Sequence, residues 1–221
     1  FTSDSVVLAN FLKIKRGENA VEIGSGSGVI SILATKKTNA KSIIGFEVQR
    51  ELFEMANKSL ILNNIKNVEF INDDVRNYKK YVQPGSVDVV FSNPPYKRQG
   101  SAQDNQNQSK TIARHEKYLP LQDLVECVNG MLKFGGRAYF VYDADRCAEM
   151  IFELKCAKLQ PKRMFFTENG KGKVILFVVE AVKGGKDGVT VLPNLITNDR
   201  DGEYLQSIKL GVWGDLHHSA K

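Results

Sequence analysis

The sequence predicts an α/β fold in which helices cover both faces of one seven-stranded, mostly parallel sheet that ends in an antiparallel hairpin. Three observations support this prediction. From residue 20 to about 182, short β-branched runs alternate with segments of helical period, which is the pattern of βαβ units. A glycine-rich loop follows the first of these runs. The last two runs are separated only by residues 168–173, a link too short for a crossover helix, so they should pair antiparallel.

Each element follows from a local pattern. β-branched and aromatic runs predict strands at Ala20–Ile23, Ser42–Glu47, Val68–Ile71, Val87–Ser92, Arg137–Tyr142, Met164–Thr167 and Val174–Ala181. Amphipathic segments between them predict helices at Ser5–Lys13, Ser27–Lys36, Glu51–Asn63, Leu121–Met131 and Asp143–Ala157. Gly135-Gly136 and Pro161 are expected to separate elements. We expect residues 1–182 to form one domain and residues 183–221 to pack on it as an extension.

Composition narrows the class of protein. A chain of 221 residues that is 42% hydrophobic can build a core without disulfides or metals. Cys127, Cys147 and Cys156 are odd in number and lack CxxC spacing, so we expect reduced core thiols in a cytoplasmic protein. Apolar stretches such as Val174–Val182 are shorter than the roughly 20 residues of a bilayer span, and no signal segment opens the chain. The net charge of +6 favours a polyanionic partner.

A glycine loop, Gly24-Ser25-Gly26-Ser27-Gly28, follows the first strand and opens a helix. Its glycines allow a tight turn and the close approach of a nucleotide-like ligand. The third glycine falls four positions after the first, whereas a dinucleotide fingerprint needs five, so the spacing argues against NAD. Glu22, just before the loop, would repel a pyrophosphate but attract an ammonium group. S-adenosylmethionine carries an ammonium group and no phosphate.

Carboxylates at the ends of the next two strands extend this pattern. Glu47, followed by Val48, can accept hydrogen bonds from both hydroxyls of a ribose. After the third strand come Asp73 and Asp74; Asp74 can accept from an adenine amine while the Val75 amide donates to the ring. Singly, these residues are equally typical of helix caps and turns. At the carboxyl ends of successive strands, they predict a site for S-adenosylmethionine and its product S-adenosylhomocysteine, with no metal.

The order of these features resembles the class I S-adenosylmethionine-dependent methyltransferases, which have a Rossmann-like fold, over residues 2–182. The fourth strand then runs directly into Asn93-Pro94-Pro95-Tyr96. Two prolines fix the backbone and remove two donors, so an amino nitrogen could donate to the Asn93 side chain and the Pro94 carbonyl, with Tyr96 against its planar group. These contacts would orient the nitrogen lone pair toward a sulfonium methyl. The tetrapeptide is similar to the signature of methyltransferases that act on adenine N6, cytosine N4, guanine N2 or glutamine N5.

Residues 97–117 contain few apolar side chains and predict a loop that is mobile without a ligand. It ends in Ala113-Arg114-His115-Glu116. Together with residues 1–9, the glycine loop, the tetrapeptide and Asp201-Gly202-Glu203-Tyr204, this element makes the chain similar to the bacterial tRNA(Val) adenine-N6 methyltransferases. The resemblance implies that an adenine of a tRNA anticodon loop is flipped into the pocket and stacked on Tyr96. It also implies that Asp4, a candidate helix cap, lies near the methionine end of the cofactor, and that the substrate contacts Lys97, Arg98, Arg114 and His115.

Two other readings are open at this stage. A protein-glutamine N5 methyltransferase, or another enzyme that methylates exocyclic amines of rRNA or DNA, would use the same tetrapeptide. A nucleic-acid-binding module without activity could share the scaffold, although the intact carboxylates and Asn93 argue against it. No obligate protein partner is predicted. We interpret His217-His218 as part of a solvated tail. The candidates for phosphate contacts are Lys13, Lys15, Arg16, Lys36, Lys37, Lys79, Lys80, Lys97, Arg98, Lys162 and Arg163.

Overall fold

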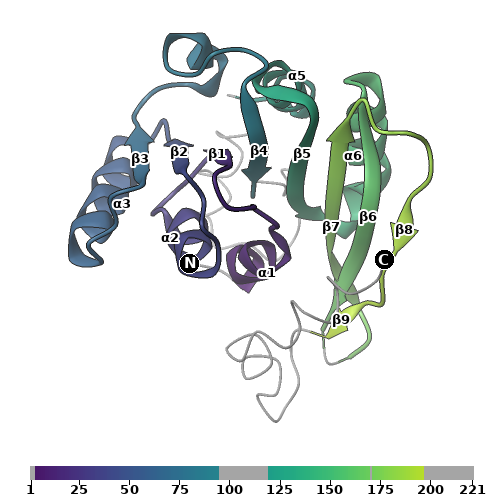
Figure 1. Ribbon diagram of the computed structural model, residues 1–221. Helices are drawn as coiled ribbons and strands as arrows, with labels where there is room; N and C mark the ends of the chain where they lie inside the picture. The colour runs from purple at the N-terminus through teal and green to yellow at the C-terminus, as the bar shows by residue number, and fades with distance from the viewer. Residues whose placement is uncertain (1–2, 95–118, 170, 197–221) are drawn as a thin grey trace.

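A computed structural model describes residues 3–94, 119–169 and 171–196 (Figure 1). Within these residues one nine-stranded sheet has the order β3-β2-β1-β4-β5-β7-β6-β8, and β9 also pairs with β6. Strands β1 to β5 are parallel, whereas β7 runs antiparallel to both β5 and β6. The strands are β1 Asn19–Ile23, β2 Ser42–Phe46, β3 Val68–Ile71, β4 Val87–Ser92, β5 Leu132–Asp143, β6 Leu159–Glu168, β7 Val174–Lys183, β8 Thr190–Val191 and β9 Leu195–Ile196.

Helices cover both faces of the sheet and enclose two apolar cores. The helices are α1 Ser3–Phe11, α2 Val29–Lys37, α3 Arg50–Leu62, α5 Leu121–Met131 and α6 Cys147–Cys156, with short 3-10 helices η1 Val75–Lys80 and η2 Ala144–Arg146. Residues of α1, α2 and α3 share one core with one face of the central strands, and residues of α5, α6 and η1 share the other. The α/β class, the mostly parallel sheet and the antiparallel hairpin predicted from the sequence are therefore confirmed.

The strand order reverses between β1 and β4, and this reversal positions the site. In the register, Ile23 lies opposite both Phe46 of β2 and Ser92 of β4. The loops that begin at Gly24, Glu47 and Asn93 therefore leave the sheet at the same level and from neighbouring strands. In open α/β sheets this is where ligands bind, in the crevice outside the carboxyl ends of the strands at a switch point.

Two predicted boundaries between elements are wrong, because the residues concerned lie at β-bulges inside strands. Strand β5 begins at Leu132 and passes through Gly135-Gly136, with Gly135 at φ 77° and a register shift in the pairing with β4. Strand β6 begins at Leu159 and contains Pro161, next to a register shift in its pairing with β7. Glycine and proline are tolerated in strands at bulges, where one residue is left out of the hydrogen-bond ladder.

Smaller differences concern the ends of elements and the thiols. The helix expected over 143–157 is divided into η2 and α6, and α1 begins at Ser3, so Asp4 lies in its first turn. Of the three expected core thiols only Cys127 is buried; Cys156 is exposed. Beyond β7, Leu192 and Leu195 are buried in the core that contains α1. None of the helices in the described segments is long and apolar enough to cross a bilayer.

The ring of Phe70 supports the glycine loop from β3. A Cβ atom at Gly45 of β2 would lie 2.5 Å from Cδ1 of Phe70, and one at Gly28 would lie 2.6 Å from Cζ of the same ring. Gly28 also has φ 81°, a left-handed conformation that glycine adopts without strain, and it caps α2. Both positions therefore leave room for a side chain that packs under the loop.

We predict that Gly45→Ala destabilises the fold, because the added methyl group must displace the Phe70 ring. The expected loss in the free energy of unfolding is about 1–3 kcal/mol, measured by urea denaturation. Lys58→Ala, at an exposed position of α3, should change it by less than about 0.5 kcal/mol. Equal stability of the Gly45 variant and the wild type would show that the ring has room to move.

Candidate active site

Two hollows open at the carboxyl edge of the sheet, and Gly24 lines both. The first, here called the apolar pocket, has a volume of about 730 Å³ that is partly open to solvent. Its walls are Ile23, Gly24, Phe46, Glu47, Val48, Asp73, Asp74, Val75, Ser92, Pro94, Leu119, Leu121, Leu124 and Tyr142. The second, the glycine-loop pocket, measures about 660 Å³. It is lined by Ser5, Glu22, Gly24, Ser25, Gly26, Ser27, Val29, Ile30, Leu52 and Asn93.

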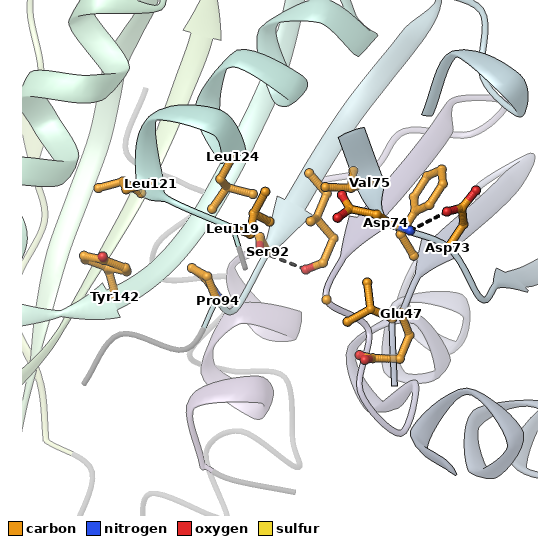
Figure 2. Close-up of a pocket in the computed structure, with 14 residues that line it drawn as sticks. Glu47, Asp73, Asp74, Val75, Ser92, Pro94, Leu119, Leu121, Leu124 and Tyr142 are labelled. Carbon is orange, nitrogen blue, oxygen red and sulfur yellow. Dashed lines mark hydrogen bonds between the residues drawn. The ribbon is translucent and has the colours of Figure 1, made fainter. Parts of the chain in front are cut away.

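The apolar pocket has two chemically different sides. Figure 2 shows Leu121, Leu124 and Tyr142 on the side of Pro94, while Glu47 and the two aspartates lie on the other side. The apolar side chains come from α5 and the end of β5, whereas the carboxylates follow β2 and β3. A flat apolar ring that carries polar groups along one edge matches this arrangement.

Glu47 is 4% exposed and joins the glycine loop to the end of β2. Its Oε2 accepts a hydrogen bond from the Gly26 amide at 2.8 Å, and its Oε1 accepts one from the Gln49 amide at 2.8 Å. The Asn72 side chain donates to the Glu47 carbonyl at 2.7 Å and fixes the turn. A carboxylate offers about four lone-pair sites, so each oxygen retains capacity for a ligand hydroxyl.

The two aspartates after β3 are held in their charged forms by different partners. The Asp73 carboxylate accepts from Asn77 at 2.8 Å, from the Tyr81 hydroxyl at 2.9 Å and from the Asp74 amide, and these bonds, that of Asn77 most of all, lower its pKa to about 2. Asp74 caps η1 through the Arg76 amide and contacts the Arg76 guanidinium at 2.6 Å, which lowers its pKa. Asp73 thus fixes the turn that presents Asp74 and Val75 to the pocket.

Glu22 is 1% exposed in the glycine-loop pocket. Its Oε2 accepts from the Ser31 amide at 3.2 Å and contacts the Ser31 hydroxyl, but its Oε1 has no hydrogen-bond partner within the described residues. Burial raises the pKa of this carboxyl to about 8; the Glu47 charge adds to the rise and the two bonds from Ser31 oppose it. An uncompensated buried oxygen marks a place where a ligand donor fits.

Asn93 contacts the first helix, although 88 residues separate the two partners. Its Nδ2 lies 3.4 Å from the Ser5 hydroxyl oxygen. Ser5 lines the glycine-loop pocket, whereas the predicted Asp4 lines neither pocket. Sequence reasoning missed Ser5, and the signal available was a hydroxyl at the start of an otherwise apolar helix.

Tyr142 is a second lining residue that sequence reasoning missed. It lies one residue before the end of β5, and Asn93 follows the end of β4, so the rule that placed the other site residues at strand ends applies to Tyr142 as well. The Arg146 guanidinium lies 4.9 Å from the centre of its ring. Leu119, Leu121 and Leu124 were likewise not assigned, because only the fold brings this segment to the pocket.

Most of the predicted cofactor residues come together in these pockets. Glu22, Gly24, Ser25, Gly26, Glu47, Val48, Asp73, Asp74, Val75 and Asn93 line one or both. Gly28 lines neither pocket and instead leaves room for the Phe70 ring under the loop. Of the tetrapeptide, Asn93 faces the glycine-loop pocket and Pro94 the apolar pocket. Pro95, Tyr96, Lys97, Arg98, Arg114, His115 and the predicted mobile loop lie outside the described residues.

The predicted phosphate-contacting residues do not share one surface. Lys15 and Arg16 precede β1, and Lys36 and Lys37 end α2, so these four lie toward the opposite edge of the sheet from the pockets. Arg163 pairs with Glu180 in a mostly buried ion pair. Lys79 and Lys80 follow β3 on η1, at the carboxyl edge. Over the same described segments, no group of three or more His, Cys, Asp or Glu side chains is arranged to hold a metal ion.

Solved structures share the fold at low sequence identity. A predicted O-methyltransferase, Atu636 from Agrobacterium tumefaciens, superposes with a TM-score of 0.74 at 16% identity, covering 94% of this chain and 96% of that one. Geranyl diphosphate C-methyltransferase from Streptomyces coelicolor, solved with Mg²⁺, geranyl diphosphate and S-adenosyl-L-homocysteine, gives 0.61 at 13% identity, with coverages of 82% and 78%. At these identities the likeness concerns the fold.

Sequence comparison identifies the family. The tRNA1(Val) (adenine(37)-N6)-methyltransferase of Aliivibrio salmonicida is 27% identical over 63% of this chain, and this match spans 58% of that protein's length. The protein of the same name from Shewanella woodyi is 24% identical, with 92% of this chain and 86% of that protein covered. A release factor glutamine methyltransferase of Fusobacterium nucleatum is 36% identical over 35% of this chain and 22% of its own length. Residues 3–153 match the profile of the methyltransferase small domain family, and the chain belongs to that family.

Proposed function

We propose that this protein transfers a methyl group from S-adenosylmethionine to the exocyclic N6 of an adenine in a tRNA anticodon loop. The observation that carries the proposal is the position of Asn93. Asn93 follows β4 at the level where Gly24 follows β1 and Glu47 follows β2. A side chain that can accept hydrogen bonds from an amine therefore lies beside the two pockets. The names of the Aliivibrio and Shewanella relatives support the choice of substrate.

The residues present fit S-adenosylmethionine. The apolar pocket would take the adenine between Val48 and Val75, and Glu47 would accept from the ribose hydroxyls. Gly24 and Gly26 have φ of 70° and 54°, and a Cβ at either position would point into open space, so the loop leaves room for a ligand against its backbone. The ammonium group would lie at Glu22, whose Oε1 has no partner among the described residues.

The reaction at the substrate nitrogen follows from the hydrogen-bond acceptors at the end of β4. The bound cofactor supplies an electrophilic methyl group on a sulfonium. The Asn93 amide oxygen and the Pro94 carbonyl would accept the two hydrogens of the substrate amine, which orients its lone pair toward that methyl group. The same oxygens favour the positive charge that develops on nitrogen. No strong general base is needed, because the nitrogen loses its proton to water after the methyl group is transferred.

An adenine in a single-stranded loop suits this site better than one in a duplex. The acceptors line the pockets at the strand ends, so the base must leave its stack to reach them. That step costs less in a loop than in a helix. Lys80 Nζ lies 3.5 Å from the carboxylate of the pocket residue Asp73 and would bring a positive charge near neighbouring phosphates.

A protein-glutamine N5 methyltransferase is the second candidate. The side-chain amide of glutamine also presents an NH2 group, and the Fusobacterium relative is 36% identical over its matching segment. The shorter coverage of that match, 35% of this chain, favours the adenine reading.

We predict opposite kinetic effects for Asn93→Ala and Glu47→Ala. Loss of the Asn93 amide should abolish methyl transfer while the cofactor Kd changes less than about tenfold, because the Asn93 amide oxygen accepts from the amine of the substrate and not from the cofactor. Glu47→Ala should raise the cofactor Kd and lose activity mainly at low cofactor concentration. Asn63→Ala, the same substitution at the exposed end of α3, serves as the control. Wild-type activity of the Asn93 variant would refute the assigned chemistry.

The substrate itself is tested with labelled cofactor. We expect label to enter unmodified tRNA and not release factors, and nucleoside mass spectrometry of the product to show N6-methyladenosine in the anticodon loop. Label in a release factor alone would favour glutamine N5. Methylation of tRNA at another base or another loop would contradict the proposed position.

A further inference from the structure

We propose that Glu22 is protonated in the empty protein and releases its proton when the ammonium group of the cofactor binds. This inference rests on the proposed use of S-adenosylmethionine. It adds a charge-coupled step to binding, and it assigns to Glu22 and Ser31 the role of matching the pocket to an amine.

Among the described residues, those around Glu22 provide hydrogen bonds but no positive charge. The carboxyl group is buried on β1, and Ser31 of α2 serves only one of its oxygens, through its amide and its hydroxyl. An ionised carboxylate would leave Oε1 buried and charged without a donor from the described residues, which is unfavourable. The Ser31 hydroxyl can donate to a carboxylate or accept from a carboxylic acid, so it suits both forms.

Charged groups on the described helices and strands around Glu22 do not offset the cost of ionising it. Glu47, after β2, is also negative and disfavours a second charge. Asp4 of α1 is another acid, and Asp88 of β4 pairs with Lys133. The cations of α2 lie in its last turn, and Arg50 of α3 is exposed and paired with Glu54. Burial in this setting raises the pKa of Glu22 to about 8, in agreement with the geometry.

A bound ammonium group makes the ionised form of Glu22 more favourable than the protonated form. Its positive charge beside the buried carboxyl stabilises the carboxylate, and its hydrogens give Oε1 a donor. The protonated acid and the ammonium ligand become a carboxylate–ammonium pair, and one proton goes to solvent. No covalent bond of the cofactor breaks. Because the ligand binds the ionised form, its apparent affinity should rise roughly tenfold between pH 6 and pH 7.

Calorimetry counts the released proton. S-adenosylhomocysteine carries the ammonium group without the sulfonium and cannot react, so its binding is titrated at pH 6.5 in two buffers of different ionisation enthalpy. The wild type should release about one proton per ligand bound. 5′-Methylthioadenosine, which lacks the amino acid part, should release none. Glu22→Gln should bind S-adenosylhomocysteine with about one proton fewer released and with an affinity that no longer changes between pH 6 and pH 7.

The outcomes separate this inference from the proposed function. Binding of S-adenosylhomocysteine without proton release, equal release with 5′-methylthioadenosine, or unchanged release in Glu22→Gln would overturn the role of Glu22 and leave the methyltransferase proposal standing. Failure of S-adenosylhomocysteine to bind at all would overturn the proposed function as well. The comparison of the two ligands uses the wild type alone, so it decides the question even when the variant does not fold.

The empty protein provides an independent prediction. Glu22 binds its proton with a pKa of about 8 in the folded chain and 4.5 as an ordinary carboxyl, so the folded state holds a proton that the unfolded state loses between these values. Stability therefore falls as pH rises through that window, and Gln cannot titrate. The Tm of Glu22→Gln minus that of the wild type should increase by roughly 10 °C from pH 5 to pH 8.5. The difference for Glu69→Gln, on an exposed position of β3, should stay constant. A constant difference for Glu22→Gln would show that this carboxyl is ionised throughout.

Discussion

The site depends on the pair of hydrogen bonds that the buried Glu47 carboxylate accepts from Gly26 and Gln49. One bond reaches the loop after β1 and the other stays within the loop after β2, so a single side chain holds together two loops that line the pockets. A buried carboxylate is stable only when such donors reach it. Gly26 donates from a left-handed conformation, φ 54°, that glycine adopts without strain. The chain itself thereby holds both pockets in shape.

The register of the sheet places the residues that follow β1, β2 and β4 next to one another. Because Ile23, Phe46 and Ser92 lie at one level, the residue after each strand contributes a different function: loop backbone, carboxylate and amide. The packing of α1 brings Ser5 to Asn93, and both residues line the glycine-loop pocket. Under the proposed function, the Asn93 amide and the cofactor would therefore lie at one edge of the sheet, as the positioning of a methyl transfer requires.

The sequence predicted these elements well where the hydrophobic pattern and the local backbone agreed. β3, β4 and α5 have the predicted bounds, since their apolar runs end at clear turn residues. Gly135-Gly136 and Pro161 misled the prediction because bulges hide them inside β5 and β6, and a bulge depends on the partner strand. The carboxylates and the glycine loop were found from spacing alone. Ser5 was not, since only tertiary packing brings α1 to the glycine-loop pocket. Tyr142 was not assigned either, although the same strand-end rule applies to it.

A crystal structure of the protein with S-adenosylhomocysteine tests the central claim most directly. The account requires the ribose hydroxyls on Glu47, the amine beside Glu22 and the sulfur on the side of Asn93, with the amide of Asn93 open to the pocket. A ligand bound away from this edge of the sheet, or an Asn93 side chain turned into the interior, would contradict it.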